Sequence, residues 1–547
     1  MTASIEKGDQ AAGVKRDVLW WLAALLTVTL LVAAGQWRSG AWSAGYGAYP
    51  DEPAHFVGGL MVHDYVLSGS RSPLAFARNY YLFQPYFAIG FWPPLFYVLE
   101  GFWMLVAGYS RISVMILSGG LSALVALLLF AAVRQWVSGG LALAIAGSFL
   151  VIPSVEWSSS LVMTDMCVVL FCLAATLAAG RYFETRAWLW AILTGLAASL
   201  ALLTKYLALY VLLPPALLML IDRRWDLMRG ARTWSIAGII AVLCGPWVFW
   251  SRKFALIGWD FQQVDLWQRA WAIVAVLRAD LGTILTVAAV LAAVWALLHW
   301  GRLTATQRLL CLQLPCIAAF VYAGPSGIER RHFMPGYPGL LAVIALAIHW
   351  IGSEKRFLRQ PVLRQTILRQ TMAFALVAVI VGRAASDKTE TLPGGVVRQV
   401  ARDVSRAQQS GAILVPATME GPMIAELASA ERERSRILLI RPSKLLARMN
   451  WTGTQYQLLV PDVQALTSLF DKYPIDTIIL ATFPGRAELP HDRLLRQMVA
   501  ADKRWEVQRK YAEPGGGYWE VYRRPSRPDA GTAALMAFMR THLSAMQ

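Results

Sequence analysis

Residues 18–34 read VLWWLAALLTVTLLVAA, an apolar run of about 17 residues that Lys15 and Arg16 precede. A run of this length crosses the hydrocarbon core of a bilayer as a helix. The whole chain has the same character, because 57% of its 547 residues are hydrophobic and only 16% are charged. Soluble domains carry nearer a quarter charged residues. The start resembles a signal peptide, but many apolar runs follow it, so an uncleaved first membrane helix is predicted.

About eleven such runs predict a polytopic α-helical membrane protein. The predicted spans lie near 18–36, 112–133, 139–153, 164–180, 188–204, 206–221, 233–250, 281–300, 309–323, 334–351 and 370–385. One further apolar run, 92–108, contains Glu100 and is interpreted as a helix that lies along the membrane surface.

The placement of Lys and Arg predicts the orientation of these spans. The net charge of +17 is not read as a nucleic-acid footprint, because Lys and Arg of membrane proteins collect in cytoplasmic loops. A cytoplasmic N-terminus gives the inner segments most of these residues. Asp51, Asp165, Lys205, Arg330 and Arg331 are then all expected on the outer side.

The character of the sequence changes after Arg383. Short apolar runs at 412–415, 437–440, 457–460 and 477–480 alternate in part with helix-like stretches, which is typical of a small α/β domain with a largely parallel sheet. A turn at 514–517 joins two runs that alternate like an edge hairpin. We therefore predict a membrane domain over 1–385 with its first outer loop at 37–111, an extracytoplasmic α/β domain over 386–525, and a tail over 526–547.

The first candidate catalytic group is Asp51-Glu52-Pro53-Ala54-His55, which follows the first span. Pro53 suits an early helix position, with Asp51 or Glu52 as the cap. His55 then lies on the same helix face as either carboxylate. A carboxylate here can take a proton from a hydroxyl or hold a metal, and ionisable groups at a membrane usually mark function. The simpler interpretation is that both acids only cap a surface helix.

Asp165 is a second acid, in a short polar outer loop at the start of a predicted span. It either caps that helix or orients a substrate. Lys205, Arg330 and Arg331 oppose the usual distribution of positive charge, and a phosphate is a natural partner for them. Each cation alone is better explained by contact with lipid headgroups. Together with the acids, they favour a site.

Other side chains carry weaker signals. Tyr81 belongs to an aromatic-rich stretch, 71–97, that either contacts a sugar or lipid or forms an interfacial belt. His55 and His332 are candidates for contact with a substrate or metal. The stretch 252–280 is a candidate lid by its length and composition. The five cysteines show no CxxC spacing, which argues against a cysteine metal site or redox pair.

Five motifs occur in an order that resembles a known family. They are the Asp51-Glu52 pair, Pro93-Pro94-Leu95-Phe96-Tyr97, Asp165, the stretch from Gly195-Leu196-Ala197 to Lys205, and Arg331-His332-Phe333-Met334-Pro335. Residues 15–385 are in this way similar to the GT-C superfamily of polyprenyl-phosphate-dependent glycosyltransferases. Their nearest resemblance is to bacterial proteins akin to protein mannosyltransferases and the lipid A aminoarabinose transferase.

The resemblance implies a multi-pass protein of the bacterial inner membrane that inverts the anomeric carbon of the transferred hexose or pentose. Asp51 would act as the base or orient the acceptor, with Glu52 beside it and Asp165 as the second acid. Lys205 and Arg330 or Arg331 would bind the phosphate of a polyprenyl-phosphate-sugar donor. His55 stands where relatives often have an aromatic residue, which leaves its role open.

The implied partners are the lipid-linked donor, membrane lipids and an envelope lipid, glycan or protein acceptor, and no nucleic acid. The sequence requires no cofactor, and a divalent metal remains an option because some relatives use one. Two other functions stay open at this stage. A transporter or lipid flippase should show internal repeats and charges near mid-membrane, and no clear repeat is seen. A membrane-anchored binding protein would act through its outer α/β domain.

Overall fold

The computed structural model describes residues 2–87, 90–255, 265–324, 327–351, 382, 395–407, 411–431, 437–448, 456–525 and 531–545. The chain divides into two compact units. Unit 1 comprises residues 1–39, 90–96 and 115–391, and unit 2 comprises residues 40–89, 97–114 and 392–547. The first loop, predicted over 37–111, therefore lies mostly in the same unit as the C-terminal residues.

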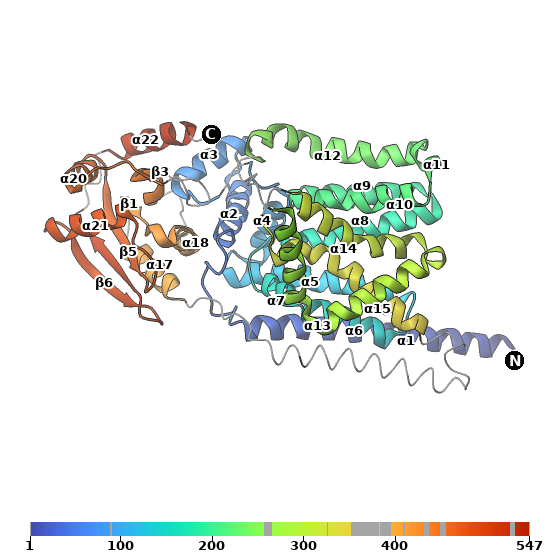
Figure 1. Ribbon diagram of the computed structural model, residues 1–547. Helices are drawn as coiled ribbons and strands as arrows, with labels where there is room; N and C mark the ends of the chain where they lie inside the picture. The colour runs from blue at the N-terminus through green and yellow to red at the C-terminus, as the bar shows by residue number, and fades with distance from the viewer. Residues whose placement is uncertain are drawn as a thin grey trace. The chain divides into compact units, whose positions relative to one another are not determined.

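Unit 1 is helical wherever regular structure is described (Figure 1). Its elements are α1 (Thr2–Arg38), α5 (Arg111–Arg134) except its first four residues, which belong to unit 2, α6 (Gly139–Leu150), α7 (Pro153–Ser159), α8 (Asp165–Thr185), α9 (Trp188–Leu202), η1 (Tyr206–Leu212), α10 (Leu213–Ile221), α11 (Trp225–Met228), α12 (Ala231–Ala255), α13 (Leu266–Leu298), η2 (Trp300–Arg302), α14 (Ala305–Ala323), η3 (Arg330–Gly336) and α15 (Tyr337–Ile351).

Within the described residues, seven helices are long and apolar enough to cross a membrane, or eight if the bent pair α6–α7 is one span. The predicted membrane fold class is thereby confirmed. Two other expected spans, 188–204 and 206–221, form shorter apolar helices. The expected span 370–385 lies outside the described residues except for residue 382.

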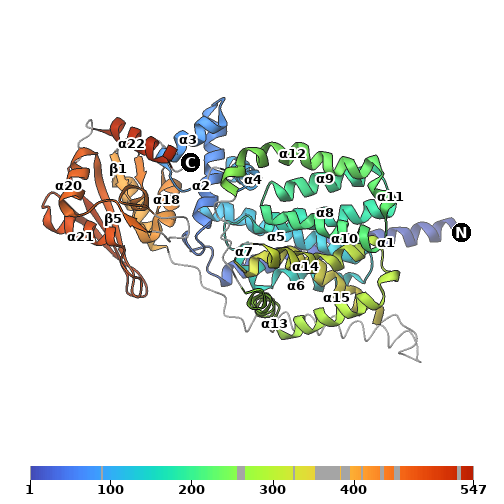
Figure 2. The ribbon, with the colours of Figure 1, turned by 45° about the horizontal axis from the view of Figure 1, so that its top comes forward.

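The interior of unit 1 is built around α8, which packs against α9 and α14, while α14 packs against α15. Figures 1 and 2 show these helices side by side from two directions. Of the apolar segment of α8, 72% is buried, against 6% for α12, so α12 leaves its apolar surface available to lipid. Gly180 permits the close approach of α14, because a Cβ there would lie 2.3 Å from the Thr306 hydroxyl oxygen.

Two breaks in the helices have local causes. The 71° bend between α6 and α7 falls just before Pro153, and the residue before a proline disfavours helical backbone. Gly282 interrupts α13 with φ 70° and ψ 169°, a conformation that glycine adopts readily.

The stretch 252–280, the candidate lid, is not a loop in its second half. Helix α13 begins at Leu266, and the Asp265 carboxylate caps it by accepting a hydrogen bond from the Trp267 amide at 2.9 Å. The stretch reads as a loop because Asp265, Arg269 and Asp280 interrupt its apolar residues. Residues 256–264 lie outside the described residues.

The first loop contributes three helices to unit 2: α2 (Glu52–Ser68), α3 (Pro73–Phe83) and most of α4 (Leu95–Ala107). Helix α4 has 13 residues and is therefore about 20 Å long, shorter than the roughly 30 Å hydrocarbon core. Helices α2 and α4 approach closely at glycines. A Cβ on Gly58 would lie 2.8 Å from the Tyr97 ring, and one on Gly59 would lie 2.3 Å from the Glu100 carboxyl carbon.

The C-terminal part of unit 2 contains a five-stranded sheet in the order β2-β1-β5-β7-β6 (Figure 1). Strands β1 (Gly411–Leu414), β2 (Ile437–Ile440) and β5 (Ile475–Thr482) are parallel. Strands β6 (Glu506–Ala512) and β7 (Tyr518–Arg523) form an antiparallel hairpin whose strand β7 pairs with β5. The predicted small α/β domain with a parallel sheet and an edge hairpin is thus present.

One predicted strand belongs elsewhere. The run 457–460 is outside the five-stranded sheet, because β4 (Gln457–Leu458) pairs antiparallel with β3 (Ala447–Arg448). The helices of this part are α17 (Val396–Ala407), η4 (Ala417–Met419), α18 (Glu420–Ala430), α19 (Pro442–Leu445), α20 (Val463–Lys472), α21 (Pro490–Ala501) and α22 (Thr532–Ala545). Helix α18 packs against α17 and also against α2 of the first loop, within unit 2.

Candidate active site

Asp165 and Lys205 form an ion pair inside unit 1. Asp165 is the first residue of α8, and Lys205 is an extended residue between α9 and η1. The Lys205 Nζ lies 2.8 Å from an Asp165 carboxylate oxygen, and the two side chains are 16% and 3% exposed. A buried carboxylate needs such a partner, because an unpaired charge in this environment is strongly destabilising. The two residues that the sequence analysis selected separately therefore lie together.

The segment 329–332 adds more charge to this group. The 3-10 helix η3, which carries Arg331 and the buried His332, packs against α8, which begins at Asp165. The Arg331 Nε also donates to Glu329 at 2.8 Å. Arg330, the other predicted phosphate ligand, is exposed on η3. Four of the predicted site residues, Asp165, Lys205, Arg331 and His332, thus share one polar cluster, whose chemical roles stay predictions.

Asp280 is a buried acid of unit 1 that the sequence analysis did not select. Its carboxylate accepts hydrogen bonds from the Ser154 amide at 3.0 Å, the Ser154 hydroxyl at 2.5 Å and the Tyr337 hydroxyl at 2.6 Å. It thereby ties together the starts of α7 and α15 and the kink of α13. A signal was present, because Asp280 directly precedes the predicted span 281–300 and acids at such places are rarely incidental.

Glu52 and Arg111 form a buried ion pair inside unit 2. The Glu52 carboxylate and an Arg111 terminal nitrogen are 2.9 Å apart, and the side chains are 0% and 3% exposed. The Gly47 amide also donates to Glu52 at 3.3 Å, and Arg111 donates to the Ala41 carbonyl at 2.8 Å. No local sequence signal identifies Arg111, because 59 residues separate it from its partner. The pair fixes the start of α2.

Helix α2 begins where the Asp51–His55 motif predicts a helix start. Asp51 occupies the N-cap position and Pro53 the first turn, yet the Asp51 side chain makes no capping hydrogen bond. Helix capping therefore does not account for the Asp51 carboxylate. The His55 Nδ1 lies 3.0 Å from the Tyr97 hydroxyl. Tyr81 is half-buried with its ring edge-on to Phe87 at 5.4 Å between centroids, which is a packing contact.

Glu100 is fully buried in α4, and neither of its carboxylate oxygens has a hydrogen-bond partner in the described residues. Burial raises the pKa of Glu100 well above its usual range. The sequence predicts Glu100 on a surface helix, but the structure buries it against Gly59 of α2. Its carboxyl group is therefore expected to be neutral in the folded protein near neutral pH.

Replacing Glu100 by Gln is expected to raise thermal stability more at pH 8.5 than at pH 5.5. The unfolded chain has an ordinary glutamate pKa of about 4.3. Above that pH the unfolded state releases a proton that the folded state keeps, so stability falls as pH rises. Thermal unfolding of both proteins across this pH range measures the difference. A constant difference between them would contradict a neutral Glu100.

The described residues contain no group of three or more His, Cys, Asp or Glu side chains arranged to hold a metal ion. His55 in unit 2 contacts a tyrosine, and His332 in unit 1 lies among two cations and two carboxylates. The optional divalent metal of the sequence analysis therefore stays a prediction.

Two residues of this cluster lie in a stretch of sequence that matches a known protein family. Residues 92–250 match the family described as dolichyl-phosphate-mannose-protein mannosyltransferase. This stretch includes both Asp165 and Lys205. A search of curated protein sequences finds no match.

Solved structures of low sequence identity share the fold. ArnT from Cupriavidus metallidurans in its apo state has a TM-score of 0.56 and 14% identity, over 93% of this chain and 98% of that chain. The same protein bound to undecaprenyl phosphate has a TM-score of 0.53 and 14% identity, over 92% and 98%. An oligosaccharyltransferase from Archaeoglobus fulgidus, tethered to an acceptor peptide, has a TM-score of 0.51 and 11% identity, over 84% and 69%.

At these identities the structures show the fold, and the family match adds the sequence evidence over residues 92–250. The chain has the GT-C fold, and its resemblance to the polyprenyl-phosphate-dependent glycosyltransferases of that superfamily is confirmed.

Proposed function

We propose that this protein transfers a hexose or pentose from a polyprenyl-phosphate donor to an acceptor on an envelope lipid, glycan or protein. The observation that carries the proposal is the Lys205–Asp165 ion pair beside Arg331 and His332. The negative charge on the donor phosphate grows as its bond to the sugar breaks. Cations held in fixed positions stabilise that charge. Both members of the pair lie within the stretch that matches the mannosyltransferase family.

The proposed step exchanges one bond for another at the anomeric carbon. An acceptor hydroxyl gives its proton to Asp51 as its oxygen bonds to that carbon. The bond between the carbon and the phosphate oxygen breaks at the same time, and the lipid phosphate leaves with the bonding electrons. Lys205 and Arg331 stabilise that phosphate, and the sugar inverts its anomeric configuration.

Glu52 takes a different role in this proposal from Asp51. Because Glu52 is fully buried against Arg111, it positions the start of α2 and does not itself meet a substrate. Asp51 is half-buried at the same helix start, with a carboxylate that the helix does not use as a cap. We also propose that the reaction takes place on the outer face of the bacterial inner membrane, with unit 2 on that side.

Replacing Arg331 by Ala is expected to weaken donor binding by about 10- to 100-fold and to leave the acceptor KM unchanged. A hydrogen bond to a charged group contributes about 1.5–3 kcal/mol, which corresponds to this range. Binding of undecaprenyl phosphate, the lipid carrier that remains after transfer, to the full-length protein in nanodiscs is measured by native mass spectrometry and reports the phosphate contact that donor and carrier share.

Arg302→Ala is the matched control, since Arg302 is an exposed arginine of unit 1 on η2. Equal donor affinities for wild type, Arg331→Ala and Arg302→Ala would remove Arg331 from the phosphate site.

Treatment with EDTA before a transfer assay distinguishes a metal-dependent reaction from a metal-independent one.

A further inference from the structure

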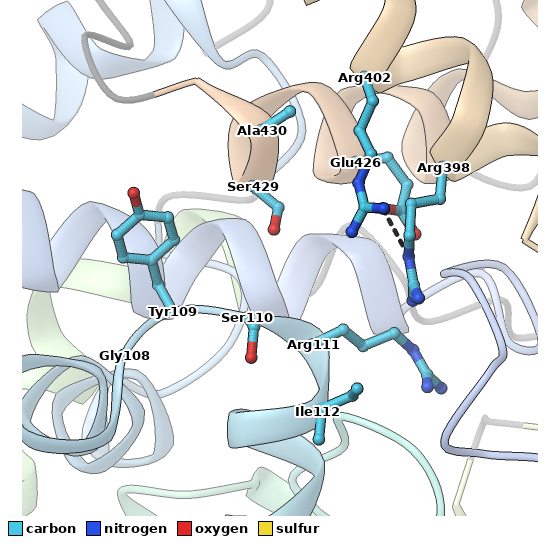
Figure 3. A pocket seen from close by; sticks show the side chains of 10 residues that line it. All are labelled: Gly108, Tyr109, Ser110, Arg111, Ile112, Arg398, Arg402, Glu426, Ser429 and Ala430. Atoms are coloured by element: carbon cyan, nitrogen blue, oxygen red, sulfur yellow. Dashed lines mark ion pairs between the residues drawn. The ribbon is translucent and has the colours of Figure 1, made fainter.

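A cavity of about 410 Å³ lies inside unit 2, between the first residues of α5 and the helices α17 and α18 (Figure 3). Ser110 and Arg111 line the cavity at the start of α5. The remaining charged side chains come from α17 and α18. Those that carry the argument are Arg398 and Arg402 from α17, and Glu426 and Ser429 from α18.

The wall of this cavity has three arginines and one carboxylate. Arg398 and Arg402 are four residues apart on α17, so their side chains leave the same helix face and repel each other. The Glu426 carboxylate is 3.4 Å from the Arg398 Nε and accepts a hydrogen bond from the Tyr46 amide at 3.3 Å. The Glu426 carboxylate is therefore the ion-pair partner of Arg398.

The other two arginines differ in their partners. Arg111 is paired with the buried Glu52 at 2.9 Å. Arg402 is exposed, and no carboxylate in the described part of the chain pairs with it. Figure 3 shows Arg398 and Arg402 extending from α17 toward the side of the cavity where Ser110 and Arg111 lie. The cavity thus carries an excess of positive charge that the described residues do not neutralise.

We propose that this cavity binds the phosphate-ester headgroup of a second ligand. Guanidinium groups match the oxygens of a phosphate with paired donors. The hydroxyls of Ser110 and Ser429 can each donate one more hydrogen bond. The volume lies within the range of small-molecule sites, and it exceeds what a bare phosphate needs, so a glycerol or sugar attached to the phosphate fits as well.

Two kinds of molecule carry such a headgroup. One is a water-soluble phosphate ester, and the other is an anionic phospholipid. The first arm of the test titrates sn-glycerol 3-phosphate into full-length protein in phosphatidylcholine nanodiscs and measures binding by calorimetry. The second arm measures retention of phosphatidylglycerol by the protein, using native mass spectrometry. Unphosphorylated glycerol serves as the ligand control.

Arg402→Ala is expected to lower the affinity at least tenfold, with Arg402→Lys in between because Lys keeps the charge but not the paired donors. The matched control is Arg406→Ala, which removes an exposed arginine of the same helix that does not line the cavity. Affinity for the charged ligand should also fall as salt is added.

Binding of the soluble ester that depends on Arg402 supports the proposal and identifies a soluble ligand. Binding of the lipid alone, again dependent on Arg402, supports it and identifies a lipid headgroup. The proposal is overturned if neither ligand binds, or if Arg402→Ala and Arg406→Ala bind as wild type does. None of these measurements requires sugar transfer, so they test this site separately from the proposed reaction.

Discussion

Asp51→Asn is expected to lower sugar transfer by about 10²- to 10⁴-fold, the usual contribution of a general base. Asparagine has nearly the size of aspartate and remains a good N-cap, so α2 should still form. An amide cannot accept the proton of the acceptor hydroxyl. The kcat of the full-length variant, measured with a defined polyprenyl-phosphate sugar, reports this loss.

The control for this prediction is Asp462→Asn, which changes another N-cap aspartate of unit 2. Asp462 caps α20 through a 2.8 Å hydrogen bond from the Ala465 amide, and the residue is exposed. That variant should retain full activity and a normal expression level. Wild-type turnover by Asp51→Asn would exclude Asp51 as the base, whatever the control shows.

Arg111→Ala is expected to destabilise unit 2 by about 3–5 kcal/mol, the cost of breaking a buried ion pair from one side. The variant leaves the Glu52 carboxylate, which is 0% exposed, without its guanidinium partner. Hydrogen exchange of residues 40–114 measures the local opening free energy directly. We expect exchange in α2 to accelerate accordingly.

The matched control is Arg509→Ala, which removes an arginine that is 57% exposed from its ion pair with Asp403. Exposed pairs contribute only about 0–1 kcal/mol, so exchange should change little there. The double variant Glu52→Gln with Arg111→Ala should recover part of the loss, because it removes the stranded charge. Equal effects of Arg111→Ala and Arg509→Ala would show that the buried Glu52–Arg111 pair contributes no more to stability than an exposed pair.

The membrane helices are predicted well where charged residues stand at both ends of an apolar run. The expected span 112–133 and helix α5 agree because Arg111 and Arg134 delimit the run. Prediction from the sequence failed where an element depends on a distant partner. The run 457–460 has the local character of a core strand, yet it pairs with Ala447–Arg448, which no local pattern reveals.

The candidate site shows the same division. Separate local signals predict Asp165 and Lys205, the first as an acid at the start of a span and the second as a cation on the outer side, and the structure pairs them. The sequence predicts a phosphate as the partner of Lys205, whereas in the structure Asp165 already supplies an anion. Prediction from the sequence also missed Arg111 and Asp280, whose importance comes from contacts with Glu52, Ser154 and Tyr337 far away in the chain.

The pairing of Lys205 with Asp165 has a mechanistic consequence. In the proposed reaction the donor phosphate shares the Lys205 ammonium with this carboxylate, so the lysine is already oriented when the donor binds. Arg331 is held in a similar way by Glu329 at 2.8 Å. Cations fixed before the substrate arrives need little reorganisation in the transition state, which is how electrostatic catalysis gains most of its effect.

The most direct test of the central claim is mass spectrometry of envelope lipids, glycans and proteins. It compares cells that contain the wild-type protein, the Asp51→Asn variant or neither. The account predicts that at least one lipid, glycan or protein gains the mass of a single hexose or pentose only when the wild-type protein is present. Identical masses in all three kinds of cell would contradict a sugar transferase.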